Sequence, residues 1–351
     1  MRHPRDVLLG ATAVAPLPVC DHYCGVPARM TKSLALQAEM TEELGACVFD
    51  VTLDCEDGAP VGGEKNHANT VVALANQAQS AIKKVAPRVA VRVHPVDHAA
   101  FEQDIEIIVG GAARALCHVM IPKVDRLADV DRAVGLVDKW AVQAGRTTPL
   151  PLHVLIESPA AVHQAFAIAA HPRVQSLSFG LMDFVSAHGG AIPASAMAVQ
   201  TAAEADGLDQ FSHPLVLQAK LALSSACHAN GKVPSHCVVT EFNDTALLLT
   251  AARRASRALG YTRMWSIHPA QIRPILAAFA PDVKEVDLAT RILAAAVQAD
   301  WAPISVAGKL HDRASYRYFW QVLERAHQTG QRLPDEALAY FRPDAWTTAS
   351  R

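Results

Sequence analysis

Two carboxylates each follow a short apolar run that has the pattern of a buried β-strand. Glu157 ends the run HVLIE, and Asp183 follows LSFGLM. A third acidic group in LDCEDG, formed by Asp54, Glu56 and Asp57, stands in the same relation to an earlier run. Acidic side chains at the end of a buried strand cost free energy unless a cation meets them, and Mg²⁺ takes carboxylate oxygens together with water and substrate. The sequence therefore predicts a metal-dependent enzyme.

The elements that would position these acids alternate along the chain. Amphipathic stretches with helical period separate short strand-like runs, which is typical of a parallel α/β protein. The strand-like runs span residues 12–20, 46–54, 88–94, 115–123, 151–158, 174–180, 235–241 and 263–268. Helical patterns cover residues 30–44, 69–84, 124–140, 159–170, 214–231 and 244–260. Eight alternations predict a (β/α)₈ barrel, with a doubly wound open sheet as the alternative.

The remaining stretches set the expected domain organisation. Residues 185–209 are too long for a simple connection and predict an active-site loop. After the last strand, residues 269–280, 286–302 and 314–328 have helical patterns, and Gly308 marks a turn before the last of them. We expect a barrel domain over residues 1–300 and a C-terminal helical extension, or lid, over residues 301–351.

Composition narrows the class of protein. Hydrophobic residues make up 51% of the 351 residues, enough for a large core, and a net charge of −2 offers no basic surface for nucleic acid. Seven cysteines, an odd number, do not suggest a disulfide framework and favour a reducing cytoplasm. The first twenty residues resemble a secretory leader, but Asp6, Pro16 and Pro18 favour a first core strand instead. No apolar run is long enough to predict a membrane span.

Further reactive side chains occupy the same position relative to the predicted strands. In a parallel barrel the catalytic groups gather at the carboxyl ends of the strands. Besides the acids, Arg92, His94, Lys123 and His268 fall at such ends. Carboxylates, a guanidinium, an ammonium and an imidazole together suit one metal ion that binds an anionic, oxygen-rich small molecule.

Five motifs occur in order along the chain: LDCEDGAP, AVRVH, IPKV, LIESPAAV with SFGLMDF, and SIHPAQI. Together they resemble the citrate lyase β-subunit-like and malyl-CoA lyase branch of the metal-dependent HpcH/HpaI aldolase superfamily, over about residues 48–313. The resemblance implies reversible carbon–carbon cleavage of a 3-hydroxyacyl-CoA thioester of malyl, citramalyl or citryl type. The products would be an acyl-CoA and a 2-oxo acid.

The resemblance also implies roles for individual residues. Glu157 and Asp183 would bind Mg²⁺, with Mn²⁺ as a substitute, while Glu56 and Asp57 would support the metal by holding its water. Arg92 would face the substrate carboxylate or the oxygen that gains negative charge. His94, Lys123 and His268 would contact the substrate.

Two more stretches resemble the malyl-CoA lyases in particular. VAGKLHDRAS is similar to a lid segment whose aspartate exchanges the enolate proton in a neighbouring subunit, which implies that Asp312 acts in a homo-oligomer, a trimer or a multiple of one. Arg29 and Lys32 in VPARMTKS resemble the basic residues that meet the CoA phosphates. The chain departs from the family pattern at His94, His188 and His236, where the substrate would lie.

Each assignment has a structural alternative. Glu157 and Asp183 could cap helices, Arg92 could be a structural ion pair, and Glu56 with Asp57 could belong to an ordinary acidic turn. Lys123 could be a solvated charge, His268 a packed histidine, and Asp312 a surface ion-pair partner. Cys20, His22 and Cys24 lack the second ligand pair that a closed zinc site needs, so we interpret them as ordinary thiols and an ordinary imidazole.

Two other functions remain open from the sequence. A thioester hydrolase could use the same metal site if Asp312 positioned water. A non-enzymatic subunit that binds partner proteins through the barrel is the alternative from a different class.

Overall fold

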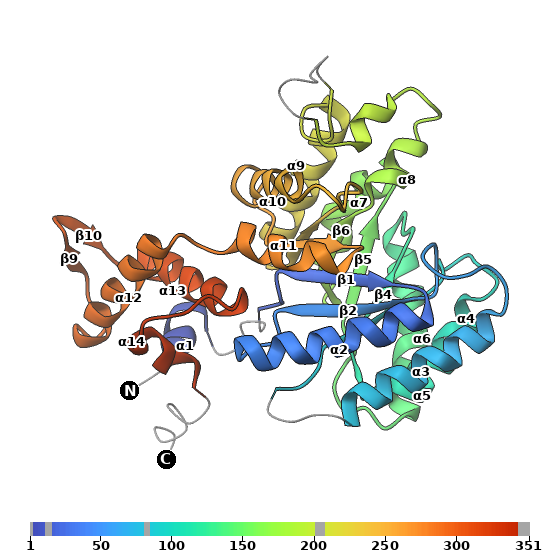
Figure 1. Cartoon of the computed structure of the whole chain (residues 1–351), viewed down its shortest axis with the longest axis horizontal. Helices are drawn as coiled ribbons and strands as arrows, with labels where there is room; N and C mark the ends of the chain where they lie inside the picture. The colour runs from blue at the N-terminus through green and yellow to red at the C-terminus, as the bar shows by residue number, and fades with distance from the viewer. Residues whose placement is uncertain (1–2, 11–15, 81–84, 201–207, 343–351) are drawn as a thin grey trace. The chain divides into compact units, whose positions relative to one another are not determined.

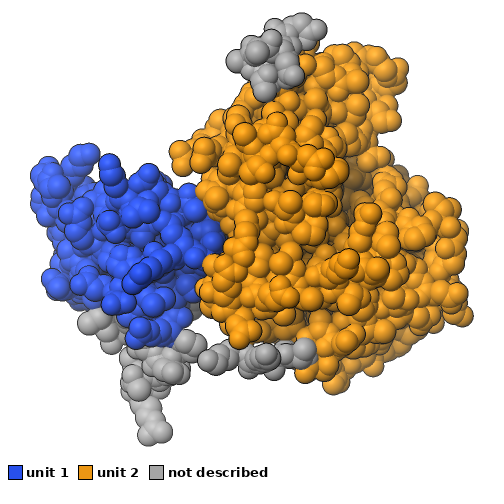
Figure 2. Space-filling model, in the orientation of Figure 1, with its two compact units in different colours: residues 1–18, 279–351 blue, residues 19–278 orange. Residues whose placement is uncertain are grey.

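The computed structural model describes residues 3–10, 16–80, 85–200 and 208–342. The chain forms two compact units (Figure 2). The barrel unit spans residues 19–278, and the terminal unit combines residues 1–18 with residues 279–351. The boundary expected at residue 300 differs from this division, because α12 (Val283–Gln298) packs against α13 (Arg313–Gln328).

Eight parallel strands close into a barrel in sequence order, which confirms the predicted (β/α)₈ fold and not the open sheet. The barrel closes where Cys20 of the first strand pairs with Met264 of the eighth. The strands are β1 (Cys20–Cys24), β2 (Phe49–Asp54), β3 (Val89–Arg92), β4 (Leu116–Ile121), β5 (Leu152–Ile156), β6 (Val174–Phe179), β7 (Val233–His236) and β8 (Arg263–Ser266).

Helices connect and cover these strands, as Figure 1 shows for α2 beside β2. The longer ones are α2 (Pro27–Leu44), α3 (Glu64–Ser80), α6 (Leu127–Gln143), α7 (Pro159–Ala170), α9 (Pro214–Ala229), α10 (Thr245–Ala258) and α11 (Ile272–Phe279). Shorter pieces are α4 (Phe101–Asp104), η1 (Ile105–Val109), α5 (Gly110–Ala112), α8 (Leu181–Ser186), η2 (Ala194–Met197) and η3 (Pro269–Gln271). None of the described helices is both long and apolar enough to cross a bilayer.

Local sequence explains where these helices begin. Asp244 precedes α10 and accepts a hydrogen bond from the Leu247 amide, and Ser158 caps α7 in the same way through the Ala161 amide. In α10, Leu248, Ala251, Ala252 and Ala255 are buried, because their helical spacing gathers them on one face. Each such helix therefore presents an apolar stripe to the barrel.

The first strand lies further along the chain than predicted. The apolar run at residues 12–20 contains Pro16 and Pro18, which have no N–H to donate to a ladder, and residues 12–15 lie outside the described part of the chain. The strand instead comprises CDHYC, whose polar residues are all buried. The prediction for this strand was wrong because it assumed that an inner strand must be apolar.

The barrel interior explains the polar strand. Asp21, Asp50 and Arg263 are fully buried, and the Arg263 guanidinium lies 2.7 Å from a carboxylate oxygen of each acid. Between β5 and β6, Nδ1 and Nε2 of His153 lie 2.7 and 2.6 Å from the hydroxyls of Ser176 and Ser178. Buried polar groups of this kind are tolerated only when they are paired, so the interior is an ion-pair and hydrogen-bond network.

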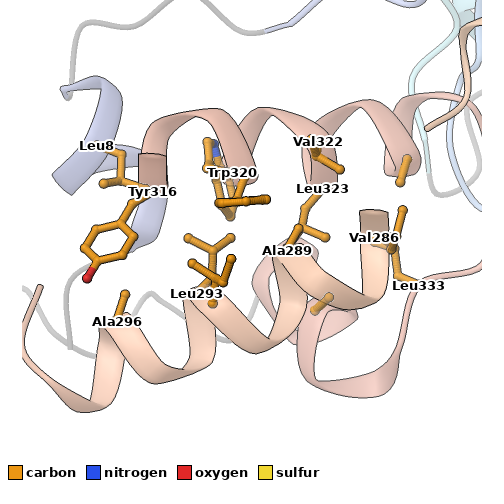
Figure 3. Close-up of a cluster of buried hydrophobic side chains, with 14 of the residues drawn as sticks. Leu8, Val286, Ala289, Leu293, Ala296, Tyr316, Trp320, Val322, Leu323 and Leu333 are labelled. Atoms are coloured by element: carbon orange, nitrogen blue, oxygen red, sulfur yellow. The ribbon is translucent and has the colours of Figure 1, made fainter. Parts of the chain in front are cut away.

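The terminal unit has its own apolar core. It contains α1 (Pro4–Leu9), α12, the antiparallel hairpin β9 (Ile304–Val306) and β10 (Lys309–His311), α13, α14 (Asp335–Leu338) and η4 (Ala339–Phe341). Figure 3 shows Trp320 of α13 and Leu293 of α12 pointing toward one another, and both are fully buried. The hairpin turn at Ala307 and Gly308 has positive φ at both residues, which the strand twist favours.

Candidate active site

The predicted acids gather at the carboxyl ends of the barrel strands. Asp54 is the last residue of β2, Arg92 is the last residue of β3, and Glu157 directly follows β5. Asp183 lies in the first turn of α8, which begins just after β6. The site therefore draws on consecutive strands, as expected for this fold.

Glu157 is the electrostatic centre of the site. Its side chain is buried, and its Oε2 accepts a hydrogen bond of 2.8 Å from the Lys123 amide. Burial, together with the negative charge of Asp183, raises the pKa of Glu157 to about 8. Since α7 is capped by Ser158, Glu157 does not serve as the cap of the helix that follows it.

Gly180 makes room for Glu157 between the two strands. A Cβ at residue 180 would lie 2.4 Å from the Cγ of Glu157, a distance that real Cβ atoms do not tolerate. The same glycine is the N-cap residue of α8, which carries Asp183. Gly180 therefore leaves room for the side chain of Glu157 beside the start of α8, the helix that carries Asp183.

Arg92 is held by carboxylates in a fixed orientation. Its Nε donates to Asp54 Oδ1 over 2.7 Å, one terminal nitrogen binds Asp54 Oδ2, and the other lies 3.0 Å from Glu56 Oε2. Asp54 is itself oriented by the amides of Glu56 and Gly58. Arg92 therefore forms the structural ion pair with Asp54, but these contacts leave some of its guanidinium N–H groups available to a ligand.

Lys123 connects the acidic turn to Glu157. Its ammonium group binds Glu56 Oε1 and lies 3.1 Å from Asp57 Oδ2. Burial opposes the charged form of Lys123, but hydrogen bonds and the charges of Glu56 and Asp57 outweigh burial and raise its pKa. Its backbone adopts φ of 50°, which L-residues rarely adopt.

A pocket of about 670 Å³ opens beside this cluster. Asp54 and Arg92 line its inner part, together with the rings of Tyr23 and Trp265, whose centroids lie 4.5 Å apart. Arg29, Lys32 and His268 also line the pocket, and all three are exposed. An elongated ligand with an anionic end therefore fits the pocket chemically.

Two predicted residues are engaged elsewhere. His94 Nδ1 lies 2.6 Å from Asp104 Oδ2, and the ring stacks on His98 with centroids 4.3 Å apart. The hydrogen bond that the His94 ring donates to the Asp104 carboxylate is the main cause that raises the pKa of His94. Asp312 belongs to the terminal unit, where its carboxylate caps α13 by accepting from the amides of Ala314 and Ser315.

The aromatic part of the pocket was missed from the sequence. Trp265 lies in the strand-like run at residues 263–268, where aromatic residues normally indicate core packing, and Tyr23 lies just after the run at residues 12–20 that was expected to be the first strand. Their side chains alternate with those of His22 and Ser266, and this alternation was the only signal that they could face the barrel axis. The Arg92 guanidinium carbon lies 5.6 Å from the centre of the Tyr23 ring, so this ring makes a cation–π contact with the arginine of the site.

Side chains of metal-ligating types also meet deeper in the barrel. Among the described residues, the groups with three such side chains close together are Asp21, His118 and His153, and Asp50, Cys117 and His118. We interpret them as the interior ion-pair network, because Arg263 pairs with both acids, Arg88 pairs with Asp50 as well, and these guanidinium groups would repel a divalent cation. Burial lowers the pKa of His118 to about 3, so its ring is neutral there.

Glu157 and Asp183 fit a divalent cation better. Carboxylate oxygens are the ligands that Mg²⁺ prefers, and the elevated pKa of Glu157 shows that its charge is insufficiently compensated without one. Lys123 orients Glu157 through its backbone amide and links it to Glu56 and Asp57 through its ammonium group. The site therefore combines two carboxylates that suit Mg²⁺, the guanidinium group of Arg92 and a pocket whose exposed edge carries Arg29 and Lys32.

Comparison with known proteins identifies the family to which the chain is similar. Residues 33–269 match the family described as HpcH/HpaI aldolase/citrate lyase. The L-malyl-CoA/beta-methylmalyl-CoA lyase of Cereibacter sphaeroides is 31% identical over 301 residues, which cover 81% of this chain and 90% of the relative.

Solved structures show the same similarity. A citrate lyase from Burkholderia xenovorans LB400 is 46% identical, with a TM-score of 0.75 over 97% of this chain and all of the other. The CitE protein of Mycobacterium tuberculosis, solved with magnesium, acetoacetate and coenzyme A, is 22% identical and shares the fold, with a TM-score of 0.61 over 88% of this chain and 98% of that one.

Proposed function

Because the chain belongs to the HpcH/HpaI aldolase/citrate lyase family, we propose that it is a metal-dependent carbon–carbon lyase acting on a malyl-, citramalyl- or citryl-like CoA thioester. The observation that carries this proposal is the buried Glu157 beside Asp183 at the ends of neighbouring strands. Glu157 and Asp183 would hold Mg²⁺, or Mn²⁺ in its place. When bound, the metal would polarise the carbonyl of the 2-oxo acid as a Lewis acid.

The chain's own residues divide the remaining tasks. In the cleavage direction the hydroxyl of the 3-hydroxyacyl group gives its proton to solvent and its oxygen forms the carbonyl of the 2-oxo acid, while the bond between C2 and C3 breaks and its electron pair passes to the acyl thioester as an enolate. Arg92 would donate its remaining N–H groups to the substrate carboxylate or to the oxygen that gains charge. The acidic turn at Glu56 and Asp57 would hold the metal ligands in place.

Binding of CoA would use the outer part of the pocket. Arg29 and Lys32 lie at its exposed rim, where they can meet phosphate groups without losing their hydration. His268, stacked on Phe242 with centroids 4.9 Å apart, adds a flat surface to the same rim. These residues support a thioester substrate rather than a free hydroxy acid.

Completion of the cycle requires a proton for the enolate carbon. We assign this task to Asp312, acting from the terminal unit of a neighbouring subunit in a homo-oligomer, a trimer or a multiple of one. We place the enzyme in the cytoplasm, because its seven cysteines are free thiols and a reducing compartment keeps them so.

A product assay tests the reaction class. Purified enzyme with Mg²⁺ is incubated with malyl-, citramalyl- and citryl-CoA, and the products are separated by chromatography. Acetyl-CoA together with a 2-oxo acid supports the lyase. Free CoA with the intact hydroxy acid would instead establish a thioester hydrolase, and absence of turnover for all three substrates would contradict both activities.

The metal assignment needs a separate measurement. Calorimetric titration with Mg²⁺ compares the wild type with a double variant, Glu157→Gln and Asp183→Asn. We expect the double variant to lose binding while its circular dichroism spectrum is unchanged. Equal binding by both proteins would remove these residues from the metal site.

A further inference from the structure

Lys123 occupies a backbone conformation that its own residue type disfavours. Its φ of 50° places it in the left-handed region, where a residue with a Cβ is strained and glycine is not. Such strain persists at functional sites when the surroundings require it. The strain at Lys123 therefore points to a function for its backbone amide and for its side chain.

The backbone of Lys123 serves Glu157. The left-handed conformation directs the amide of Lys123 to Glu157 Oε2 at 2.8 Å. This amide is the hydrogen-bond donor that the structure gives the buried carboxylate. The turn after β4 thus fixes the orientation of a side chain that directly follows β5.

The side chain of Lys123 serves the acidic turn after β2. The ammonium group binds Glu56 and Asp57, and Glu56 in turn binds Arg92 on β3. The lysine side chain is 37% exposed, whereas that of Glu56 is 4% exposed, so Lys123 closes the network on its solvent side. A glycine would relieve the strain but could not supply this cation.

We propose that Lys123 is a positioning residue with two separable parts: its left-handed amide orients the metal ligand Glu157, and its ammonium group holds Glu56 and Asp57 in register with Arg92. This inference rests on the proposed function and reassigns Lys123 from substrate binding to support of the reacting groups. The backbone part concerns metal affinity, and the side-chain part concerns turnover.

Two neutral variants separate the parts. Lys123→Gly removes the charge but accepts positive φ, whereas Lys123→Val removes the charge and strongly disfavours positive φ. For Lys123→Gly we expect a Mg²⁺ dissociation constant within about threefold of the wild type, because the amide is retained. For Lys123→Val we expect it to be weaker by about tenfold or more, as when a group that orients a metal ligand is lost.

The substrate-free measurements keep this test independent of the reaction. Mg²⁺ affinity is measured by calorimetry and folding by circular dichroism, with Ala307→Gly, at another position with φ of 50°, as the control for placing glycine at positive φ. Equal Mg²⁺ affinity of the Gly and Val variants would overturn the backbone part. Loss of affinity in the Gly variant, with its fold intact, would overturn it as well.

Steady-state kinetics test the side-chain part on whichever thioester the wild type cleaves. For Lys123→Gly and Lys123→Asn we expect kcat to fall by about tenfold or more with KM little changed, the loss typical when support of a metal site is removed. A raised KM with unchanged kcat would show that Lys123 binds substrate and overturn the proposal. Unchanged kcat and KM would show a solvated charge and overturn it too. If the wild type cleaves no thioester, the proposed function fails, while the metal measurements still decide the backbone part.

Discussion

The raised pKa of Glu157 predicts that metal binding depends steeply on pH. In the metal-free protein, burial and the charge of Asp183 raise this pKa from 4.5 to about 8. A metal ion requires the ionised carboxylate, so below this pKa each bound ion must displace a proton. Between about pH 9 and pH 6, the apparent affinity for Mg²⁺ should therefore fall by about a hundredfold, or roughly 2.7 kcal/mol.

The raised pKa of Glu157 also determines the direction in which the stability of the folded protein changes with pH. Between about pH 4.5 and pH 8 the folded, metal-free protein holds a proton at Glu157 that the unfolded chain has lost. This contribution to stability is complete at low pH and is lost as the pH rises through about 8. Saturating Mg²⁺ should offset the loss, so the metal should stabilise the protein most at alkaline pH.

Calorimetry in buffers of different ionisation enthalpy measures both affinity and proton release. We expect close to one proton released per Mg²⁺ near pH 6.5 and almost none near pH 9. The metal-free Asp183→Asn variant serves as the control, because removing the neighbouring charge should lower the Glu157 pKa, which titration of the carboxyl group by infrared spectroscopy measures without Mg²⁺. An affinity that is flat over this range, without proton release, would refute the assignment of Glu157 as a buried ligand.

Three further substitutions follow from the geometry. Arg263→Met should destabilise the barrel by about 3–5 kcal/mol in chemical denaturation, because it leaves the buried Asp21 carboxylate without its cation, whereas Asp50 keeps Arg88; a loss below 1 kcal/mol would contradict the ion-pair interpretation. Arg92→Lys should abolish turnover while the fold persists, because an ammonium group cannot form the fork with Asp54; unchanged kinetics would remove Arg92 from the site. Gly180→Ala should weaken Mg²⁺ binding measured by calorimetry, because its Cβ would displace Glu157; wild-type affinity would show that the carboxylate has room to move.

The barrel could be predicted because its signals are local. Buried strands and amphipathic helices repeat with distinct periods, and the polar residue after each strand falls at the carboxyl edge by topology alone. Glu157 and Arg92 were therefore placed at the correct ends of their strands. The first strand escaped prediction because the buried Asp21 is paired with Arg263, which lies 242 positions later in the chain, and accepts a hydrogen bond from Thr52 of the next strand. Pairing at such a distance leaves no trace in the local pattern.

Side-chain partners were the least predictable part of the site. His94 stands at a strand end like Arg92, yet its ring binds Asp104 from the following helix. Nothing in the sequence around His94 distinguishes a ring held by a helix from a ring directed at a substrate. The strain at Lys123 was equally hidden, because lysine gives no local indication of positive φ. Both features arise from packing between elements rather than from the residue's own preference.

The excess of negative charge in the site indicates the order in which the metal and the substrate would bind. Carboxylates outnumber cations in the cluster, which contains Asp54, Glu56, Asp57, Glu157 and Asp183 against Arg92 and Lys123. A 2-oxo acid is an anion, so this excess would repel it at close range. A divalent cation reduces the excess and also replaces the proton on Glu157. On this proposal Glu157 and Asp183 would hold the metal before the acid approaches Arg92, and the same ion, when bound, would supply both the Lewis-acid chemistry and the positive charge that substrate entry needs.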